Sequence, residues 1–387
     1  MKNQKKLKIN LPPYKFILSG GGTGGHIYPA IAIANALKKK FTDAEFLFIG
    51  ASGKMEMQRV PSAGYQIVGL PITGLQRKIT LSNLMFPFRV IKSVWRARKI
   101  IKQFRPDVVI GTGGFASGPA LRAAVSLKIP TLIQEQNAFP GLTNRMLANK
   151  ATKICAGVPG LERYFPKEKI ILTGNPVRQD ILNSSQLKPE AYSYFQLDPQ
   201  KKTLLVLGGS LGAASLNKAV FMGFDLFLDA GYQVIWQTGK TFIQEAREKA
   251  EKRKEGNFSV HDFIERMDFA YSIADLVVSR AGASSIAELQ LSEKPCILIP
   301  SPNVTDDHQT HNAANLVRKE AALLIKDSDA ENKLIPEAIA LLKDESRRQN
   351  MSVQISKLAK PDAANRIANE VEKLIPTFNS TKAHAEL

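Results

Sequence analysis

The sequence predicts an α/β fold made of two doubly wound halves, each built around a parallel sheet. Short apolar segments alternate with amphipathic segments almost throughout, which is typical of parallel strands connected by helices. A glycine-rich turn between an apolar segment and a helical pattern occurs in both halves. The length of 387 residues exceeds what one ordinary core accommodates and fits two domains.

The first half contains five expected strands. They are KFILSG (15–20), EFLFIG (45–50), DVVIGT (107–112), PTLIQE (130–135) and KIILTG (169–174). Ala30–Lys40 carries apolar residues at helical spacing and is expected to follow the first strand as a helix. The pattern breaks near Gly174–Gln200, a segment richer in Pro, Ser and Gln that lacks a clear strand.

The second half restarts the same alternation. Its expected strands are TLLVLGG (203–209), YQVIWQTG (232–239), LVVSRAG (276–282) and PCILIP (295–300). Phe242–Lys254 is an expected amphipathic helix. The segment PDAANRIANEVEKLI (361–375) is expected to form a closing helix, and the residues after it read as a frayed tail.

Composition narrows the class of protein. Cys155 and Cys296 are too few for a disulfide framework or a structural zinc site, and both lie in apolar segments. We interpret them as buried thiols in a reducing cytoplasm. The basic N-terminus lacks the apolar core of a signal peptide, and no apolar run approaches the roughly 18–20 residues that span a bilayer. We expect a soluble protein or one peripheral to a membrane.

The net charge of +18 indicates an anionic partner. No acidic residue occurs between Glu56 and Asp107, where large apolar residues are interleaved with basic ones. The basic residues of this window are Arg59, Arg77, Lys78, Arg89, Lys92, Arg96, Arg98, Lys99, Lys102 and Arg105. The mixture suits an anionic membrane surface, and equally an amphipathic helix with a solvated basic face. Pro87 predicts that the window is not one unbroken helix. Nucleic acid is disfavoured because no recognisable binding motif accompanies the charge.

The glycine-rich turns carry the main chemical signal, beginning with GGGTGGHIYPA (20–30). The backbone N–H groups of such a turn and the dipole of the next helix bind phosphate, and the missing side chains allow close approach. His26 and Ile27 stand where a P-loop needs Lys and Ser/Thr, and no acidic residue follows the second strand as a dinucleotide site requires. A kinase and a dehydrogenase are therefore disfavoured. Two facing sheets would form a cleft for a diphosphate-bearing donor and a second substrate.

Two charged residues near these turns are candidates for donor binding. Arg178 follows the first half in GNPVR and can pair with phosphate, and a linker arginine on the surface is the alternative. Glu288 lies about one helical turn after SRAGASS, where a carboxylate can accept hydrogen bonds from both ribose hydroxyls. A solvated helical glutamate is the alternative for that position.

Seven motifs occur in order: GGTGGHIYPA, GTGGFASGPA, QEQNAFPGLTN, GNPVR, GGSLGA, SRAGASSIAEL and DDHQTHNA. Through these motifs the chain resembles the MurG family of bacterial cell-wall N-acetylglucosamine transferases from about Lys15 to Asn315. The resemblance implies a GT-B fold, in which two Rossmann-like domains face each other across a cleft. It implies an N-terminal acceptor and membrane-docking domain at 14–177 and a C-terminal UDP-GlcNAc-binding domain at 178–360. A closing helix at 361–377, packing back on the N-terminal domain, and a tail at 378–387 complete the expected division.

The reaction implied by the resemblance is an inverting transfer of GlcNAc from UDP-GlcNAc to the 4-hydroxyl of the MurNAc of lipid I, which gives lipid II. No metal or other cofactor is implied, and the D-x-D pattern at 327–329 lies outside the motifs and is interpreted as a loop. Two alternatives stay open. One is a GT-B transferase with another lipid or small-molecule acceptor, and the other is a non-catalytic UDP-sugar-binding membrane scaffold.

The resemblance also assigns expected roles to single residues. Those expected to bind UDP-GlcNAc are Thr23, Gly24 and Gly25 in the glycine loop, Asn137 near the donor sugar, Arg178 and Ser210 by the diphosphate, Ile264 with a backbone contact to uracil, Ser284 and Ser285 in a phosphate-contacting turn, Glu288 at the ribose and Gln309 at the GlcNAc hydroxyls. His26 is expected to be the general base or to pair with the diphosphate of the acceptor, and Glu135 is a second candidate base. Gln134 and Phe115 stand where many relatives have His and Tyr, so neither is expected to transfer a proton.

The basic and apolar window, taken as Gln76–Arg105, matches the membrane-docking region of the family. The resemblance therefore implies a peripheral protein at the cytoplasmic face of the bacterial inner membrane. Its implied partners are UDP-GlcNAc, lipid I, the anionic membrane surface, and proteins of cell-wall synthesis and division.

Overall fold

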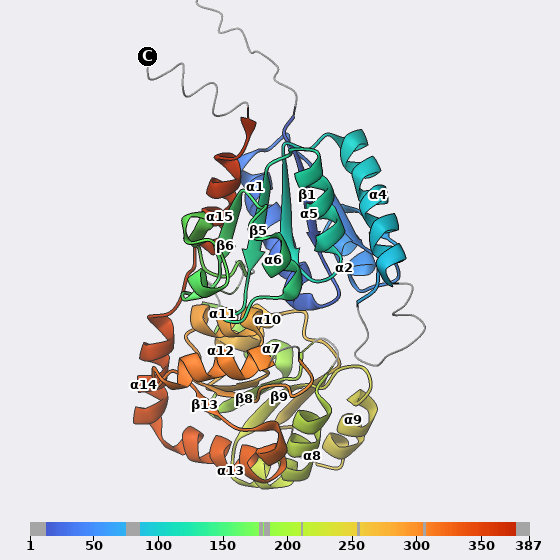
Figure 1. Cartoon of the computed structure of the whole chain (residues 1–387). Coiled ribbons are helices and arrows are strands. Elements are labelled where there is room, and N and C mark those ends of the chain that lie inside the picture. Colours follow the sequence, from blue (N-terminus) through green and yellow to red (C-terminus); the bar gives the residue numbers. More distant parts are fainter. Residues whose placement is uncertain are drawn as a thin grey trace, which may run out of the picture.

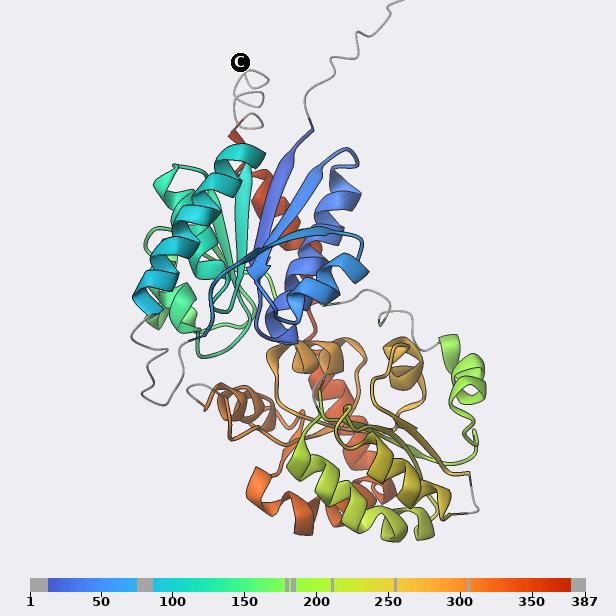
Figure 2. The ribbon, with the colours of Figure 1, turned by 90° about the vertical axis from the view of Figure 1, so that its right-hand side faces the viewer.

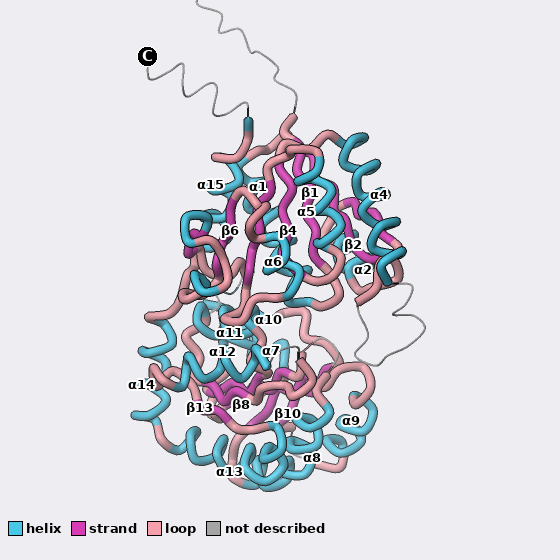
Figure 3. Tube along the Cα trace, in the orientation of Figure 1, coloured by secondary structure: helices cyan, strands magenta, loops and turns pink. Residues whose placement is uncertain are grey.

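The computed structural model describes residues 13–74, 86–177, 181, 186–209, 212–253, 256–304 and 307–376. These residues form two α/β domains, one above the other in Figure 1, each with an all-parallel sheet. Figure 3 shows the strands of each sheet as a layer with helices on both sides. The predicted α/β fold of two Rossmann-like, doubly wound domains is confirmed.

The N-terminal domain has a seven-stranded sheet with the order β3-β2-β1-β4-β5-β6-β7. Its strands are β1 (Lys15–Gly20), β2 (Glu45–Ala51), β3 (Gln66–Leu70), β4 (Val108–Gly113), β5 (Thr131–Glu135), β6 (Lys153–Ala156) and β7 (Ile170–Leu172). Its helices are α1 (Gly24–Lys40), α2 (Glu56–Ser62), α4 (Phe86–Phe104), α5 (Ser117–Ser126) and α6 (Leu142–Leu147), with short 3-10 helices η1 (Leu161–Arg163) and η2 (Lys167–Lys169) before β7.

The C-terminal domain has a six-stranded sheet with the order β10-β9-β8-β11-β12-β13. Its strands are β8 (Thr203–Leu207), β9 (Gln233–Gln237), β10 (Phe258–His261), β11 (Leu276–Ser279), β12 (Cys296–Leu298) and β13 (Leu323–Leu324). The helices that follow β7, in chain order, are α7 (Lys188–Phe195), α8 (Ala214–Asp229), α9 (Ile243–Glu251), α10 (Met267–Ile273), α11 (Ala283–Leu291), α12 (His308–Val317), the 3-10 helix η5 (Asp327–Asp329), α13 (Ala330–Lys343), α14 (Glu345–Ser356) and α15 (Ala363–Glu372).

The glycine-rich turns lie where the strand order of each sheet reverses. In the N-terminal domain, β1 pairs with β2 on one side and with β4 on the other, and glycine turns follow both β1 and β4. In the C-terminal domain, β8 and β11 are neighbours in the same way. A crevice opens at such a switch point because consecutive helices leave on opposite faces of the sheet, and ligands of open α/β sheets bind there.

Four strands were not expected from the sequence: β3, β6, β10 and β13. Three of them, β3, β10 and β13, are edge strands, where partial exposure interrupts the apolar run, as the half-buried FSVH of β10 shows. Most of the expected strands are more readily recognised because both of their faces are covered; Phe16, Ile17 and Leu18 of β1 are fully buried. The expected strand β7 is an exception, because it is a partly buried edge strand. The segment without a clear strand contains the helix α7.

Two helices differ from expectation at a glycine or a proline in their first turn. The helix after β1 begins at Gly24 instead of Ala30, so part of the glycine run is its first turn. Pro87 does not break α4, because it lies in the first turn of the helix, where its missing N–H removes no hydrogen bond. Residues 76–85 of the expected docking window lie outside the described residues. Within the described ranges, no helix is both long and apolar enough to cross a bilayer.

The last helix leaves the C-terminal domain and lies against α1 of the N-terminal domain, as Figure 2 shows from the side. Ile367 and Val371 of α15 are buried in the same core as Ile33 and Leu37 of α1. The Lys40 ammonium group lies 2.7 Å from the Glu372 carboxylate. The chain therefore crosses between the domains twice.

Candidate active site

A cavity of about 900 Å³ lies between the two domains. Its walls come from the first turn of α1, from the loop after β5, and from the segments after β8, β10, β11 and β12. The predicted site residues that line it are Thr23, Gly24, Gly25, His26, Asn137, Ile264, Ser284, Ser285, Glu288 and Gln309. Arg178 and Ser210 lie outside the described residues, and Glu135 is not part of the wall. The tertiary structure thus brings together residues that are up to about 290 positions apart.

The glycine loop between β1 and α1 packs closely on its neighbours. A Cβ atom at Gly114 would lie 2.1 Å from the carbonyl oxygen of Gly21, so only glycine fits there. Glu56 is fully buried beneath the loop and accepts the N–H of Gly22 at 3.1 Å and that of Ala51 at 2.9 Å. No sequence motif pointed to Glu56. The Glu56 carboxylate accepts the Gly22 N–H, and the Thr23 carbonyl accepts the N–H groups of His26 and Ile27. The N–H groups of Gly24 and Gly25 are therefore the ones in the first turn that can meet an anion.

His26 lies in the first turn of α1, against the glycine turn after β4. Its ring is next to Gly113 and Gly114, and its Nδ1 lies 3.2 Å from the Thr23 hydroxyl. Burial lowers the pKa of His26 to about 4, which outweighs a hydrogen bond with the Gly21 backbone; the charge of His308 adds to the lowering. The ring is therefore neutral at pH 7 and can accept a proton.

The lowered pKa of His26 also predicts a contribution to acid sensitivity. Between about pH 6.5 and pH 4, His26 of the unfolded chain binds a proton that His26 of the folded chain does not. Its contribution to the free energy of unfolding is present above pH 6.5 and is lost as the pH falls towards 4. We expect the urea midpoint to drop less between pH 7 and pH 5 in His26→Gln than in the parent; equal drops would contradict this.

Glu135 is held inside the N-terminal domain, only 1% exposed. Its carboxylate accepts four hydrogen bonds: from the Asn137 N–H at 3.0 Å, the Asn137 side chain at 3.2 Å, the Gly141 N–H at 3.1 Å and the Asn144 side chain at 2.8 Å. Burial raises the pKa of Glu135, while these hydrogen bonds lower it. Glu135 therefore holds the loop that carries Asn137, an arrangement that does not suit the expected role as a base.

The C-terminal wall contains the N-termini of α8 and α11. Gly209 and Gly212 have positive φ before α8, and Gly212 has no room for a Cβ atom, which would lie 2.3 Å from the Thr238 carbonyl oxygen. The Ser284 hydroxyl is buried at the start of α11, and none of the described residues gives it a hydrogen-bond partner. Both N-termini direct backbone N–H groups and the positive end of a helix dipole at the cavity.

The other predicted donor-binding groups lie around these turns. The Ile264 N–H donates to Gln237 Oε1 at 3.0 Å, which leaves the Ile264 carbonyl as its remaining backbone group. Glu288 accepts a hydrogen bond from the Tyr271 hydroxyl at 3.1 Å. Gln309 Oε1 accepts the Ser301 N–H at 2.8 Å and thereby holds the loop after β12.

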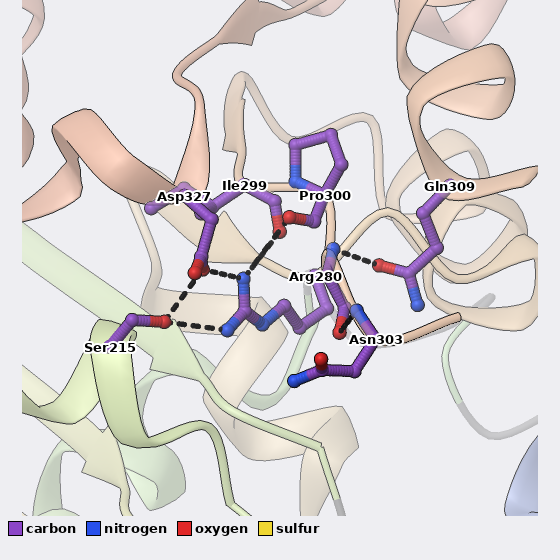
Figure 4. A network of polar contacts seen from close by, with 8 residues as sticks. Ser215, Arg280, Ile299, Pro300, Asn303, Gln309 and Asp327 are labelled. Atoms are coloured by element: carbon purple, nitrogen blue, oxygen red, sulfur yellow. Dashed lines mark hydrogen bonds and ion pairs between the residues drawn. The ribbon is translucent and has the colours of Figure 1, made fainter. Parts of the chain in front are cut away.

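A partly buried ionic network supports this wall, as Figure 4 shows. The Arg280 guanidinium lies 2.5 Å from Asp327 Oδ1 and donates to the Ser215 hydroxyl at 2.8 Å and to the Ile299 carbonyl at 3.1 Å. Ser215 also donates to Asp327 at 2.6 Å. The network ties the ends of β11 and β12 to α8, and the sequence motifs did not indicate the role of Asp327.

The D-x-D pattern is a short 3-10 helix instead of the expected loop. Asp327 pairs with Arg280, and the Asp329 carboxylate lies 2.9 Å from the Lys333 ammonium group. Within the described part of the chain, no cluster of His, Cys, Asp and Glu has the arrangement of a metal site. Both carboxylates therefore have cationic partners within the protein.

Comparisons with known proteins show which families and structures this chain resembles. The model of the glycosyltransferase family 28 N-terminal domain matches residues 16–156, and that of the C-terminal domain matches residues 203–367. A protein of Phocaeicola vulgatus named UDP-N-acetylglucosamine–N-acetylmuramyl-(pentapeptide) pyrophosphoryl-undecaprenol N-acetylglucosamine transferase is 54% identical over 94% of this chain and 97% of its own. The protein of the same name from Flavobacterium psychrophilum is 52% identical over 95% of this chain and 99% of its own. The crystal structure of Acinetobacter baumannii MurG superposes with a TM-score of 0.72 at 27% identity, covering 94% of this chain and 100% of that one.

Proposed function

Because the chain belongs to glycosyltransferase family 28, we propose that it transfers N-acetylglucosamine from UDP-N-acetylglucosamine to lipid I, giving lipid II in peptidoglycan synthesis. The observation that carries the proposal is the interdomain cavity, in which glycine turns of both sheets meet. Relatives named for this reaction match nearly the full length of the chain, including both walls of that cavity.

In the proposed mechanism, the C-terminal wall binds the donor. Glu288 accepts hydrogen bonds from the ribose hydroxyls, and Gln309 and Asn137 contact the sugar. Negative charge develops on the departing diphosphate, and the N-termini of α8 and α11 stabilise it with fixed N–H dipoles. Ser284, Ser285, Ser210 and Arg178 belong to the same proposed diphosphate site.

The N-terminal wall holds the acceptor in this mechanism. The resemblance places Thr23, Gly24 and Gly25 at UDP-GlcNAc, but we assign this α1 N-terminus to the diphosphate of lipid I, because it lies on the wall opposite the turns of the C-terminal domain. His26 accepts the proton of the MurNAc 4-hydroxyl as that oxygen attacks the anomeric carbon, with inversion. The negative charge of a bound diphosphate raises the pKa of the imidazole, which makes the ring a better base in the complex than in the free protein.

We further propose that α4 docks on the cytoplasmic face of the membrane. Its outer face exposes Phe88 (66%), Ile91 (56%) and Trp95 (73%). The exposed cations of the same helix are Lys92, Arg96, Lys99 and Lys102. Aromatic and aliphatic side chains can enter the lipid while neighbouring cations contact anionic headgroups, so this face suits an anionic bilayer surface. The enzyme would bind lipid I at that surface. Cell-wall and division proteins remain further proposed partners.

The docking proposal predicts the behaviour of a surface variant. Replacing both Phe88 and Trp95 with serine is expected to lower binding to vesicles of anionic phospholipid at least about tenfold, because two exposed aromatic anchors are lost. Sedimentation with vesicles measures it, and UDP-GlcNAc affinity is expected to hold. The control replaces Met222 and Leu226, exposed apolar residues of α8, with serine. Equal losses in both variants, or none, would contradict docking through α4.

The reaction itself is tested with labelled UDP-GlcNAc and a soluble lipid I analogue. Transfer of label to the analogue supports the proposed function. Binding of UDP-GlcNAc without transfer to this analogue, but with transfer to another lipid or small acceptor, would favour a different acceptor. Donor binding without transfer to any acceptor would favour a UDP-sugar-binding scaffold.

A further inference from the structure

The contact between the domains contains a buried asparagine outside every role described above. Asn312 lies on α12 of the C-terminal domain and is 5% exposed. Its Oδ1 accepts the N–H of Ala138 at 3.2 Å. Its Nδ2 donates to Asn137 Oδ1 at 3.4 Å and to the Ala281 carbonyl at 3.2 Å. Two of these three hydrogen bonds cross from the C-terminal to the N-terminal domain.

The orientation of the Asn312 amide group is determined by its hydrogen-bond partners in both domains. Asn137 turns its oxygen to Asn312 and its NH2 group to Glu135 Oε1, 3.2 Å away. Rotating the Asn312 amide would oppose two N–H groups at Ala138 and two carbonyl oxygens at Ala281. The hydrogen bonds therefore run from Asn312 to Asn137 and on to Glu135, while the Asn312 NH2 group also donates to the Ala281 carbonyl.

Both ends of the bridge reach elements of the candidate active site. Ala281 belongs to the turn that begins α11, where Ser284 and Ser285 face the cavity. Gln309 lies one helical turn before Asn312 on α12 and lines the cavity as well. The turn of the donor-binding domain is thus connected by hydrogen bonds to a side chain of the other domain.

We propose that Asn312 is a positioning residue for sugar transfer: through it, the donor-binding domain holds Asn137 toward the donor sugar. This inference rests on the proposed function, in which Asn137 contacts the GlcNAc unit. Without the Asn312 side chain, the Ala138 N–H and the Asn137 amide oxygen lose their partners at the domain contact, and Asn137 loses its orientation.

A double-mutant cycle tests the proposal in the full-length protein. GlcNAc transfer to the soluble lipid I analogue is measured for the parent, Asn312→Ala, Asn137→Ala and the double variant. Each single variant is expected to lower kcat/KM for UDP-GlcNAc at least about tenfold, and the double variant to match Asn137→Ala within about twofold, because Asn312 acts through Asn137. Losses that multiply would overturn the proposal, as would an unaffected Asn312→Ala.

Binding of UDP, which lacks the sugar, checks the fold of each variant and is expected to stay within about twofold of the parent. A large loss of UDP binding in Asn312→Ala would assign Asn312 to the architecture of the donor domain and overturn the proposal. If the proposed function is wrong, the parent itself transfers no sugar. That result differs from a wrong role for Asn312, in which the parent is active.

A charge variant adds a readout that a packing role would not change. In Asn312→Asp, a carboxylate faces the oxygens of Asn137 and Ala281, and protonation restores one donor. The activity of this variant relative to the parent is expected to rise from pH 8 to pH 5. Asn315→Asp places the same charge one turn later on α12, and its relative activity is expected to stay flat. A flat ratio for Asn312→Asp would overturn the proposal.

Discussion

Replacing His26 with alanine is expected to lower the turnover number for GlcNAc transfer at least about 100-fold, because a positioned general base contributes typically two to four orders of magnitude. UDP-GlcNAc affinity is expected to stay within about twofold, since the donor contacts proposed above lie mainly on the other domain. Initial rates with the soluble lipid I analogue, alongside calorimetry with UDP-GlcNAc, measure both quantities.

The same experiment separates the two roles that the sequence left open for His26. A loss confined to the turnover number indicates the base, whereas a raised KM for the acceptor with little change in turnover number indicates contact with its diphosphate. His311→Ala is the matched control, because His311 is an exposed histidine on α12. An unchanged turnover number together with an unchanged KM for the acceptor in His26→Ala would contradict both roles.

Replacing Glu288 with alanine is expected to weaken UDP-GlcNAc binding at least about 100-fold, because two hydrogen bonds from the ribose to a charged carboxylate are lost, each contributing about 1.5–3 kcal/mol. Glu288 lines the cavity from α11 and accepts a hydrogen bond from the Tyr271 hydroxyl, which orients its carboxylate. Calorimetric titration with UDP-GlcNAc measures the affinity.

Two further variants keep the Glu288 prediction specific. Glu288→Gln retains an acceptor oxygen and is expected to fall between alanine and the parent. Glu248→Ala removes an exposed glutamate of α9 in the same domain and is expected to bind as the parent does. Unchanged donor affinity in Glu288→Ala would eliminate the ribose contact.

Much of the fold follows from local patterns. Apolar runs such as that of β1 indicate strands covered on both faces, and glycine-rich turns after them indicate phosphate-sized crevices. The strands that escaped prediction are short or half-buried, as FSVH of β10 is, so their apolar pattern is weak. Helix limits were less predictable where glycine and proline enter a first turn, as at Gly24 and Pro87.

The sequence by itself determined which residues of this protein can meet a ligand, because glycine turns, a histidine and carboxylates beside them are chemical features of the chain. Only the tertiary structure decided how these groups are used. Glu135 has the chemistry of a base, yet four donors surround it inside the domain. Asp327 lies in a D-x-D pattern that was expected to be a loop, yet it belongs to a 3-10 helix and pairs with Arg280. Asn312 meets Asn137 only because the two domains close on each other. The physical reason is that hydrogen bonds and ion pairs act over about 3 Å in space, whatever the separation in sequence.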